Sequence, residues 1–168
     1  MSTGDAKALV IGIGNLMRGD DGAGPAVARL LWAMLPPDID VIEHTGEGTS
    51  LMDLWRGVER VILIDATRSG SAPGTIHRVD VIDGPLPTSL FPCSTHGFGV
   101  AEAVKMARAL HELPPQFVIY GIEAEQFAEG SGLSASLSAA IEAVAEQIVR
   151  DVAPCDNQAI ARPCSSDG

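Results

Sequence analysis

One stretch near the start of the chain, Gly12–Gly22 with the sequence GIGNLMRGDDG, constrains the fold more than any other. It follows the apolar run 8–11, which predicts a strand, and it precedes a segment with the apolar spacing of a helix. Its glycines allow the backbone to turn sharply and to adopt positive φ angles. A strand, a glycine turn and a helix in this order are typical of α/β sheets, whose functional sites lie at the carboxyl ends of the strands. We therefore expect functional groups at this turn.

Phosphate binding is the first interpretation of the turn, and its residues argue against it. In the dinucleotide fingerprint GxGxxG the third glycine allows the helix to pack closely on the strand, and Met17 occupies that position here. Asp20 and Asp21 would also place negative charges beside a pyrophosphate bound at the helix N-terminus. Adjacent carboxylates suit a cation better. For a single aspartate, the alternative is a cap on the following helix.

Apolar periodicity divides the chain into alternating strands and helices. The expected strands cover residues 8–11, 39–42, 61–64, 75–81 and 117–120, and the expected helices cover 25–35, 50–58, 100–110 and 137–152. The first helix is expected to begin at Gly24 and Pro25, and the second to carry a capping pair of Ser50 and Asp53. Strict alternation in 75–81 is typical of an edge strand.

This pattern predicts one α/β domain over residues 1–153, a three-layer α/β/α sandwich with a mainly parallel, twisted sheet. The polar, aperiodic segment 154–168 is expected to be a disordered tail. A length of 168 residues fits a single domain.

Charge and composition exclude several function classes. The chain has 22 acidic and 11 basic residues and a net charge of −11, so a nucleic-acid backbone would be repelled over most of the surface. Neither a signal peptide nor an apolar run of membrane-spanning length is present in the sequence, which predicts a cytoplasmic protein without a membrane partner. The three cysteines, Cys93, Cys155 and Cys164, form no CxxC pair and are expected to be free thiols.

Three side chains with metal-binding chemistry are expected to converge on one rim of the sheet. Asp21 follows the first strand, Asp65 follows the third, and His96 lies in the loop before the helix at 100–110. Two carboxylates and an imidazole, without a thiolate, leave coordination positions open to a substrate. Ligand type alone does not decide among nickel, zinc and manganese. An aspartate that ends a strand can instead accept hydrogen bonds from a loop.

The motifs of the chain, taken in order from about residue 8 to 150, resemble those of the hydrogenase maturation proteases. The segments that carry the resemblance are Gly12–Gly22, Gly46–Thr49, Ile64–Ala66, Pro73–Thr75, Ser94–Gly99, Tyr120–Glu123 and Gly132–Ser134. The resemblance implies an endopeptidase that removes a C-terminal extension from the large-subunit precursor of a nickel-iron hydrogenase after nickel has been inserted. Nickel then belongs to the substrate, and a metal resident in the free protein stays an open question.

The resemblance also assigns site residues. The family's metal contacts match Asp21, Asp65 and His96. The residues expected to line the substrate cleft are Gly14, Asn15, Gly46, Glu47, Gly48, Gly97 and Glu123. Amide hydrolysis needs an activated water, and a carboxylate that does not bind the metal is free to take its proton. Asp20 and Asp21 are therefore the predicted catalytic residues, with Asp20 as the hypothetical base.

Two other interpretations use the same region of the chain. A nickel-binding or chaperone module would hold the metal through the same three side chains without hydrolysis. A cysteine protease would use Cys93, three residues before His96, but no third group that would orient the histidine is evident. We expect a monomer whose partner is the hydrogenase precursor.

Overall fold

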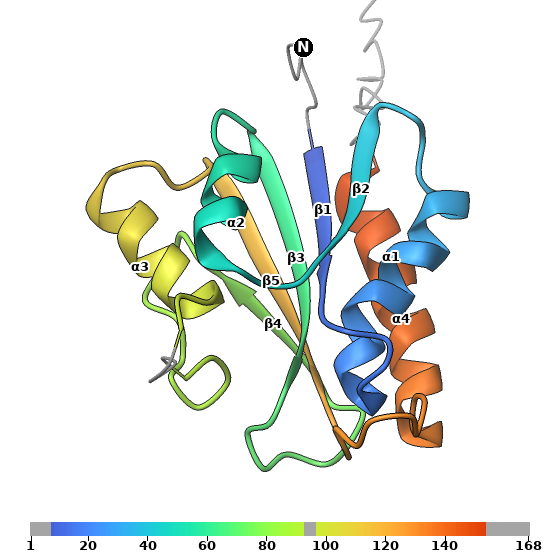
Figure 1. Ribbon diagram of the computed structural model, residues 1–168. Coiled ribbons are helices and arrows are strands. Elements are labelled where there is room, and N and C mark those ends of the chain that lie inside the picture. Colours follow the sequence, from blue (N-terminus) through green and yellow to red (C-terminus); the bar gives the residue numbers. More distant parts are fainter. Residues whose placement is uncertain (1–7, 93–96, 154–168) are drawn as a thin grey trace, which may run out of the picture.

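The computed structural model describes residues 8–92 and 97–153, which fold around one sheet (Figure 1). The strands of this described part are β1 (Ala8–Ile13), β2 (Ile39–His44), β3 (Arg60–Thr67), β4 (Ile76–Asp80) and β5 (Gln116–Glu123). Its helices are α1 (Ala23–Met34), α2 (Gly48–Trp55), α3 (Val100–Ala109) and α4 (Ala135–Val152), with a short 3-10 helix η1 (Gly19–Gly22).

The sheet has the strand order β2-β1-β3-β5-β4. β4 pairs with β5 in the antiparallel sense, whereas the pairs β1–β2, β1–β3 and β3–β5 are parallel. The mainly parallel sheet predicted from the sequence is therefore confirmed, and so is the edge position of the alternating strand.

Helices cover both faces of the sheet because its inner strands are apolar on both faces. Every residue of β1 is buried, and its side chains alternate between two cores. Ile11 packs in the core beneath α2 and α3, whereas Val10 packs in the core beneath α1 and α4. Each such side chain contributes about 1.5–3 kcal/mol when fully buried. The predicted three-layer sandwich is confirmed, with one helix pair on either side of the sheet (Figure 1).

The order of the strands creates a switch point between β1 and β3. The chain leaves β1 through α1 to reach β2, and it returns through α2, on the opposite face, to β3. Connections that diverge in this way leave a crevice at the carboxyl ends of the two central strands, where α/β proteins bind ligands. The glycine turn after β1 and Asp65 of β3 both lie at this crevice.

Two glycines bring α1 into direct contact with the sheet. A Cβ atom on Gly12 would lie 2.4 Å from the carbonyl oxygen of Gly24, and one on Gly24 would lie 2.2 Å from that of Ile13. Any side chain at either position would push α1 away from the strand. This close approach places η1, with its two aspartates, over the end of the sheet.

Several element boundaries differ from the sequence prediction. α1 begins at Ala23 with Gly22 as its N-cap, so Gly24 and Pro25 lie inside its first turn. α2 begins at Gly48, and its cap is the Glu47 side chain, so the predicted pair of Ser50 and Asp53 is wrong. β3 is longer than expected, and it contains Asp65 because its pairing with β5 continues to Thr67.

Some predictions fall on residues that the structure does not describe. These are the predicted metal contact at His96, the three cysteines, and the tail at 154–168. Within the described ranges, no helix combines the length and the apolar character that crossing a membrane requires.

Candidate active site

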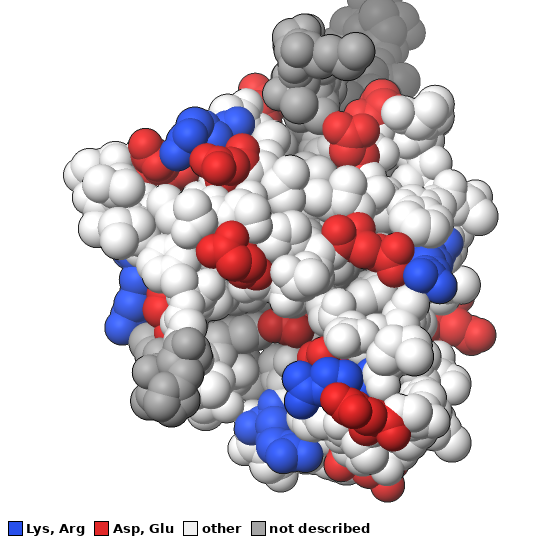
Figure 2. Space-filling model, viewed as in Figure 1, with Lys and Arg blue, Asp and Glu red and all other residues white. Residues whose placement is uncertain are grey.

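A cleft of about 380 Å³ opens at the carboxyl ends of β1 and β3, and we name it the Asp65 cleft. Asp21 and Asp65 both line it, together with Arg68. Most of its remaining wall is apolar and includes Ile13, Leu90, Phe91, Pro92, Val100, Ala101 and Phe127. In Figure 2 the molecule is hollowed below the centre of the view, and basic side chains gather along the lower edge of the hollow.

Asp21 reaches the cleft from η1 and is held there by the glycine turn. Its Oδ2 atom accepts a hydrogen bond of 3.0 Å from the backbone N–H of Asn15, and its carbonyl oxygen accepts from the same N–H at 3.2 Å. Gly14 has a φ angle of 140°, and a Cβ atom there would lie 1.8 Å from the carbonyl oxygen of Asp21. No described residue donates a hydrogen bond to the second carboxylate oxygen of Asp21, Oδ1.

Asp65 is the most perturbed carboxyl group of the site. Burial raises its pKa to about 8, the negative charge of Asp21 adds to the increase, and a hydrogen bond from the backbone of Ala66 opposes it. The two carboxylates therefore share one region and repel each other when both are ionised. Such a pair favours either a proton or a bound cation.

The described residues supply two of the three predicted metal contacts. They contain no group of three His, Cys, Asp or Glu side chains that could hold a metal ion by itself. Asp21 and Asp65 come together as the sequence predicted, and His96 lies outside the described residues. The predicted ligand set therefore stays a prediction at its third position.

Asp20, the base suggested by the sequence, lines neither the Asp65 cleft nor the space beside Asp21, and its side chain is bound to a distant segment of the chain. Its side chain is fully buried and accepts hydrogen bonds from the backbone N–H groups of Glu125 (2.8 Å), Gln126 (3.0 Å) and Ser134 (2.7 Å). The Ser134 hydroxyl donates to both of its oxygens at 2.9 and 2.8 Å. Burial alone would raise the pKa of Asp20, but these hydrogen bonds outweigh it and the net shift is downward. A carboxylate with both oxygens occupied and a lowered pKa is a poor general base.

The Gly46–Gly48 turn contributes to the site mainly by placing α2. Glu47 accepts hydrogen bonds of 2.8 Å from the N–H groups of both Thr49 and Ser50, which lower its pKa to about 2. A Cβ atom on Gly48 would lie 2.3 Å from the ring of Phe98, so only glycine fits there. Of the three predicted cleft residues in this turn, Gly46 lines the Asp65 cleft. Glu47 and Gly48 do not line it and instead position the start of α2.

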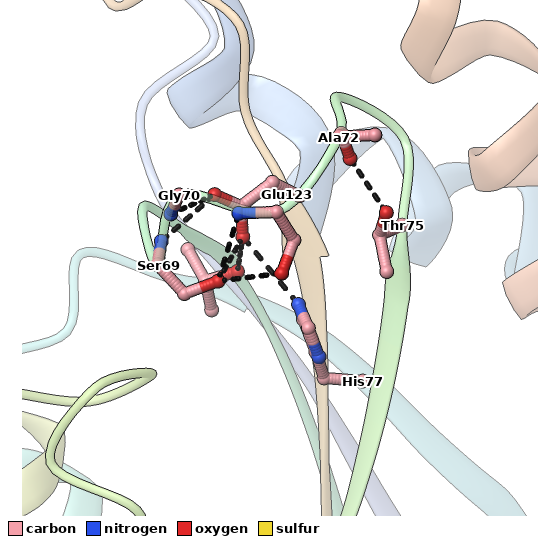
Figure 3. Close-up of polar contacts among 8 residues, drawn as sticks. Ser69, Gly70, Ala72, Thr75, His77 and Glu123 are labelled. Carbon is pink, nitrogen blue, oxygen red and sulfur yellow. Dashed lines mark hydrogen bonds and ion pairs between the residues drawn. The ribbon is translucent and has the colours of Figure 1, made fainter.

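Glu123 holds a neighbouring loop instead of lining the cleft (Figure 3). Its Oε1 atom accepts from the N–H groups of Ser69 (2.8 Å) and Gly70 (3.0 Å), and its Oε2 atom accepts from the hydroxyls of Thr67 (3.1 Å) and Ser69 (2.8 Å). The Nε2 atom of His77 lies 3.4 Å from the same Oε2. Glu123 thereby fixes the loop that follows β3. Gly97, another predicted cleft residue, is exposed and does not line the cleft.

A second cleft, of about 630 Å³, lies on the other side of Asp21, and we name it the Arg18 cleft. Its lining residues are Gly14, Asn15, Leu16, Arg18, Asp21, Pro25, Glu43, His44 and Thr45. Gly14 and Asn15 were predicted to line a substrate cleft, whereas Arg18 and His44 were missed. Their positions in the sequence could have indicated that they line this cleft, because Arg18 lies within the glycine turn and His44 ends β2.

Comparison with known proteins identifies the family. A family model described as hydrogenase maturation protease matches residues 25–151. The chain belongs to the hydrogenase maturation protease family. The predicted resemblance and the enzyme class, a protease, are therefore confirmed for this maturation protease.

Relatives and solved structures agree with this assignment. The hydrogenase expression/formation protein HupD of Thiocapsa roseopersicina is 29% identical over 122 residues, which are 71% of this chain and 55% of that protein. A putative hydrogenase maturation protease of Methanocaldococcus jannaschii is 29% identical over 152 residues, which are 86% of this chain and 95% of that protein. The structure of the hydrogenase maturating endopeptidase HybD from E. coli is 26% identical, with a TM-score of 0.74 over 86% of this chain and 90% of that one. The maturation protease thus spans about half the length of the Thiocapsa protein and nearly all of the other two.

Proposed function

We propose that this maturation protease removes the C-terminal extension from the large-subunit precursor of a nickel-iron hydrogenase, and that it recognises nickel already inserted in that precursor. The observation that carries the proposal is the pair of carboxylates, Asp21 and Asp65, on one cleft at the switch point of the sheet. His96 is the third proposed contact, on the sequence resemblance alone. The proposal places the protease in the cytoplasm as a monomer that meets the precursor as its partner.

The two carboxylates suit a divalent cation carried by a substrate. Their mutual repulsion contributes to the raised pKa of Asp65, and a cation between them would remove that repulsion and restore the ionised form of Asp65. Two carboxylates and the proposed His96 contact leave coordination positions of the metal open. Nickel can therefore keep its ligands in the precursor while it contacts the protease.

Hydrolysis requires a water molecule to add to the scissile carbonyl carbon and the C–N bond to break. Contact with nickel fixes the position of the scissile bond relative to η1, which converts a diffusional encounter into an oriented one. In this proposal Asp21 contacts nickel through Oδ2, and its Oδ1 atom accepts a proton from the attacking water and returns it to the leaving nitrogen. We assign this base to Asp21 and not to Asp20, because both oxygens of Asp20 are already hydrogen-bonded.

The experiment that tests the proposal compares precursors with and without nickel. Chelator-treated protease is mixed with either precursor, and loss of the C-terminal extension is followed by mass spectrometry. We expect cleavage of the nickel-loaded precursor only, because the chelator removes any metal from the protease and leaves the precursor as the source of nickel. Equal cleavage of both precursors would refute nickel recognition, and binding of the loaded precursor without cleavage would favour the nickel-binding module instead.

Matched variants test whether Asp21 and Asp65 contact the nickel of the precursor. Asp21→Asn and Asp65→Asn keep the size of the side chain and remove its charge, so both are expected to stay folded and to lose at least about 100-fold in the rate of cleavage. Asp38→Asn is the control, because Asp38 is an exposed aspartate before β2 and outside both clefts. Full activity of the Asp65→Asn variant would remove Asp65 from the site.

A further inference from the structure

We propose that the Arg18 cleft binds the peptide segment that cleavage releases, and that Arg18 is a specificity-determining residue which recognises carboxylate groups of that segment. This inference rests on the proposed function, and it adds the path of the substrate through the site. The segment is a short peptide with a free C-terminal carboxylate, because it is the end of a polypeptide chain.

The path follows from how the two clefts are joined. They share Gly14, Asp21 and Thr45, so a bound chain can run from one into the other past the Asp21 carboxylate. Asp65 lines only one of them. The nickel-bearing part of the precursor therefore occupies the Asp65 cleft, and the segment beyond the scissile bond continues into the Arg18 cleft.

Of the three charged residues that line the Arg18 cleft, Arg18 fits a carboxylate, whereas Asp21 lies where the two clefts meet and Glu43 is paired with Arg29. Arg18 is exposed and forms no ion pair with any described residue, whereas Arg29 is paired with Glu43 at 3.0 Å. On a chain with a net charge of −11, an arginine that no described residue pairs attracts an anion that most of the surface repels. An arginine also binds a carboxylate through two parallel N–H donors, which adds direction to the attraction.

His44 adds no second cation to this cleft. Its Nδ1 atom accepts a hydrogen bond of 2.9 Å from the N–H of Gly46, which places the proton on Nε2, 2.9 Å from the hydroxyl of Ser50. Burial lowers the pKa of His44, and the nearby Glu47 opposes that shift. Arg18 is thus the cation that lines the cleft among the described residues.

The test uses the whole protease and the peptide that the precursor releases. A synthetic copy of that peptide, with a free or an amidated C-terminus, is titrated into ¹⁵N-labelled protease while backbone amide shifts are recorded. We expect shifts at Asn15, Leu16 and Glu43, which line only the Arg18 cleft, and not at Leu90 or Ala101 of the Asp65 cleft. Arg18→Gln is expected to weaken binding of the free-acid peptide about fivefold, as is typical of a partly exposed charge pair.

The control variant is Arg56→Gln, which makes the same change in net charge at a position outside both clefts. It is expected to bind the peptide as the wild type does. Shifts confined to the Asp65 cleft, no shifts at millimolar peptide, or equal affinity of Arg18→Gln and the wild type would each overturn the inference. Cleavage of the nickel-loaded precursor is measured on the same protein. Absence of cleavage by the wild type refutes the proposed function, whereas cleavage together with any of these three results refutes the peptide site alone.

Discussion

Replacing Asp20 by alanine separates a structural role from a catalytic one. In the wild type its carboxylate accepts hydrogen bonds from three backbone N–H groups and one hydroxyl, all from the segment 125–134. Alanine would leave these donors without their acceptor. A buried donor without a partner costs about 1–3 kcal/mol. Some of these four donors can bond to water after the change, so we expect a total loss of about 3–5 kcal/mol in the free energy of unfolding. For a domain of this size, such a loss lowers the melting temperature by about 10 °C.

The pH dependence of stability gives this prediction a second readout. The pKa of Asp20 is lowered by folding, so its ionised form stabilises the native state above the unfolded pKa, near 3.8. That stabilisation is lost as the pH falls through the lower, folded pKa. The difference in stability between the wild type and Asp20→Ala should therefore be full at pH 6 and should shrink below pH 4.

Urea unfolding followed by circular dichroism measures both effects, with Asp38→Ala as the control for removal of an exposed aspartate. The remaining activity of Asp20→Ala is measured at a temperature where the variant is still folded. A variant that unfolds within about 1 kcal/mol of the wild type but cleaves no precursor would refute the structural assignment and return Asp20 to the role of base.

Three further predictions concern the metal contacts and the tail. The pKa of Asp65 is raised to about 8 in the folded state, so between pH 4 and pH 8 the group ionises in the unfolded state while the folded state keeps its proton, and the fold loses stability as the pH rises. Asp65→Asn is therefore expected to be more stable than the wild type at pH 8 by at least about 1 kcal/mol and not at pH 4. Equal urea midpoints of the two proteins at pH 8 would contradict the raised pKa. Cys93→Ser should keep its activity while His96→Ala loses it, and inactivation of the wild type by a thiol reagent, with loss of turnover in Cys93→Ser, would favour a cysteine protease. Truncation after Ala153 is expected to change neither the melting temperature nor cleavage, and a clear fall in the melting temperature would show that the tail packs on the domain.

The sequence by itself determined the architecture and the family. Strands that are apolar on both faces, such as β3, fold only in a sheet covered by helices on both sides, and the glycine turn at 12–22 must follow a strand. The sequence also predicted that Asp21 and Asp65 share one rim of the sheet, because each follows a strand of a mainly parallel sheet. That β1 and β3 are neighbours, and that both side chains line one cleft, came from the structure.

Only the tertiary structure decided which carboxylates face the cleft. Asp20 and Asp21 are adjacent in the chain, yet the partners of Asp20 lie more than 100 residues away, at Glu125 to Ser134. Glu123 likewise binds the loop at Ser69, 54 residues before it, instead of meeting substrate. The role of a carboxylate depends on which donors surround it, and those donors come from segments that only folding brings together. The same holds for the Arg18 cleft, which forms where the glycine turn meets the end of β2.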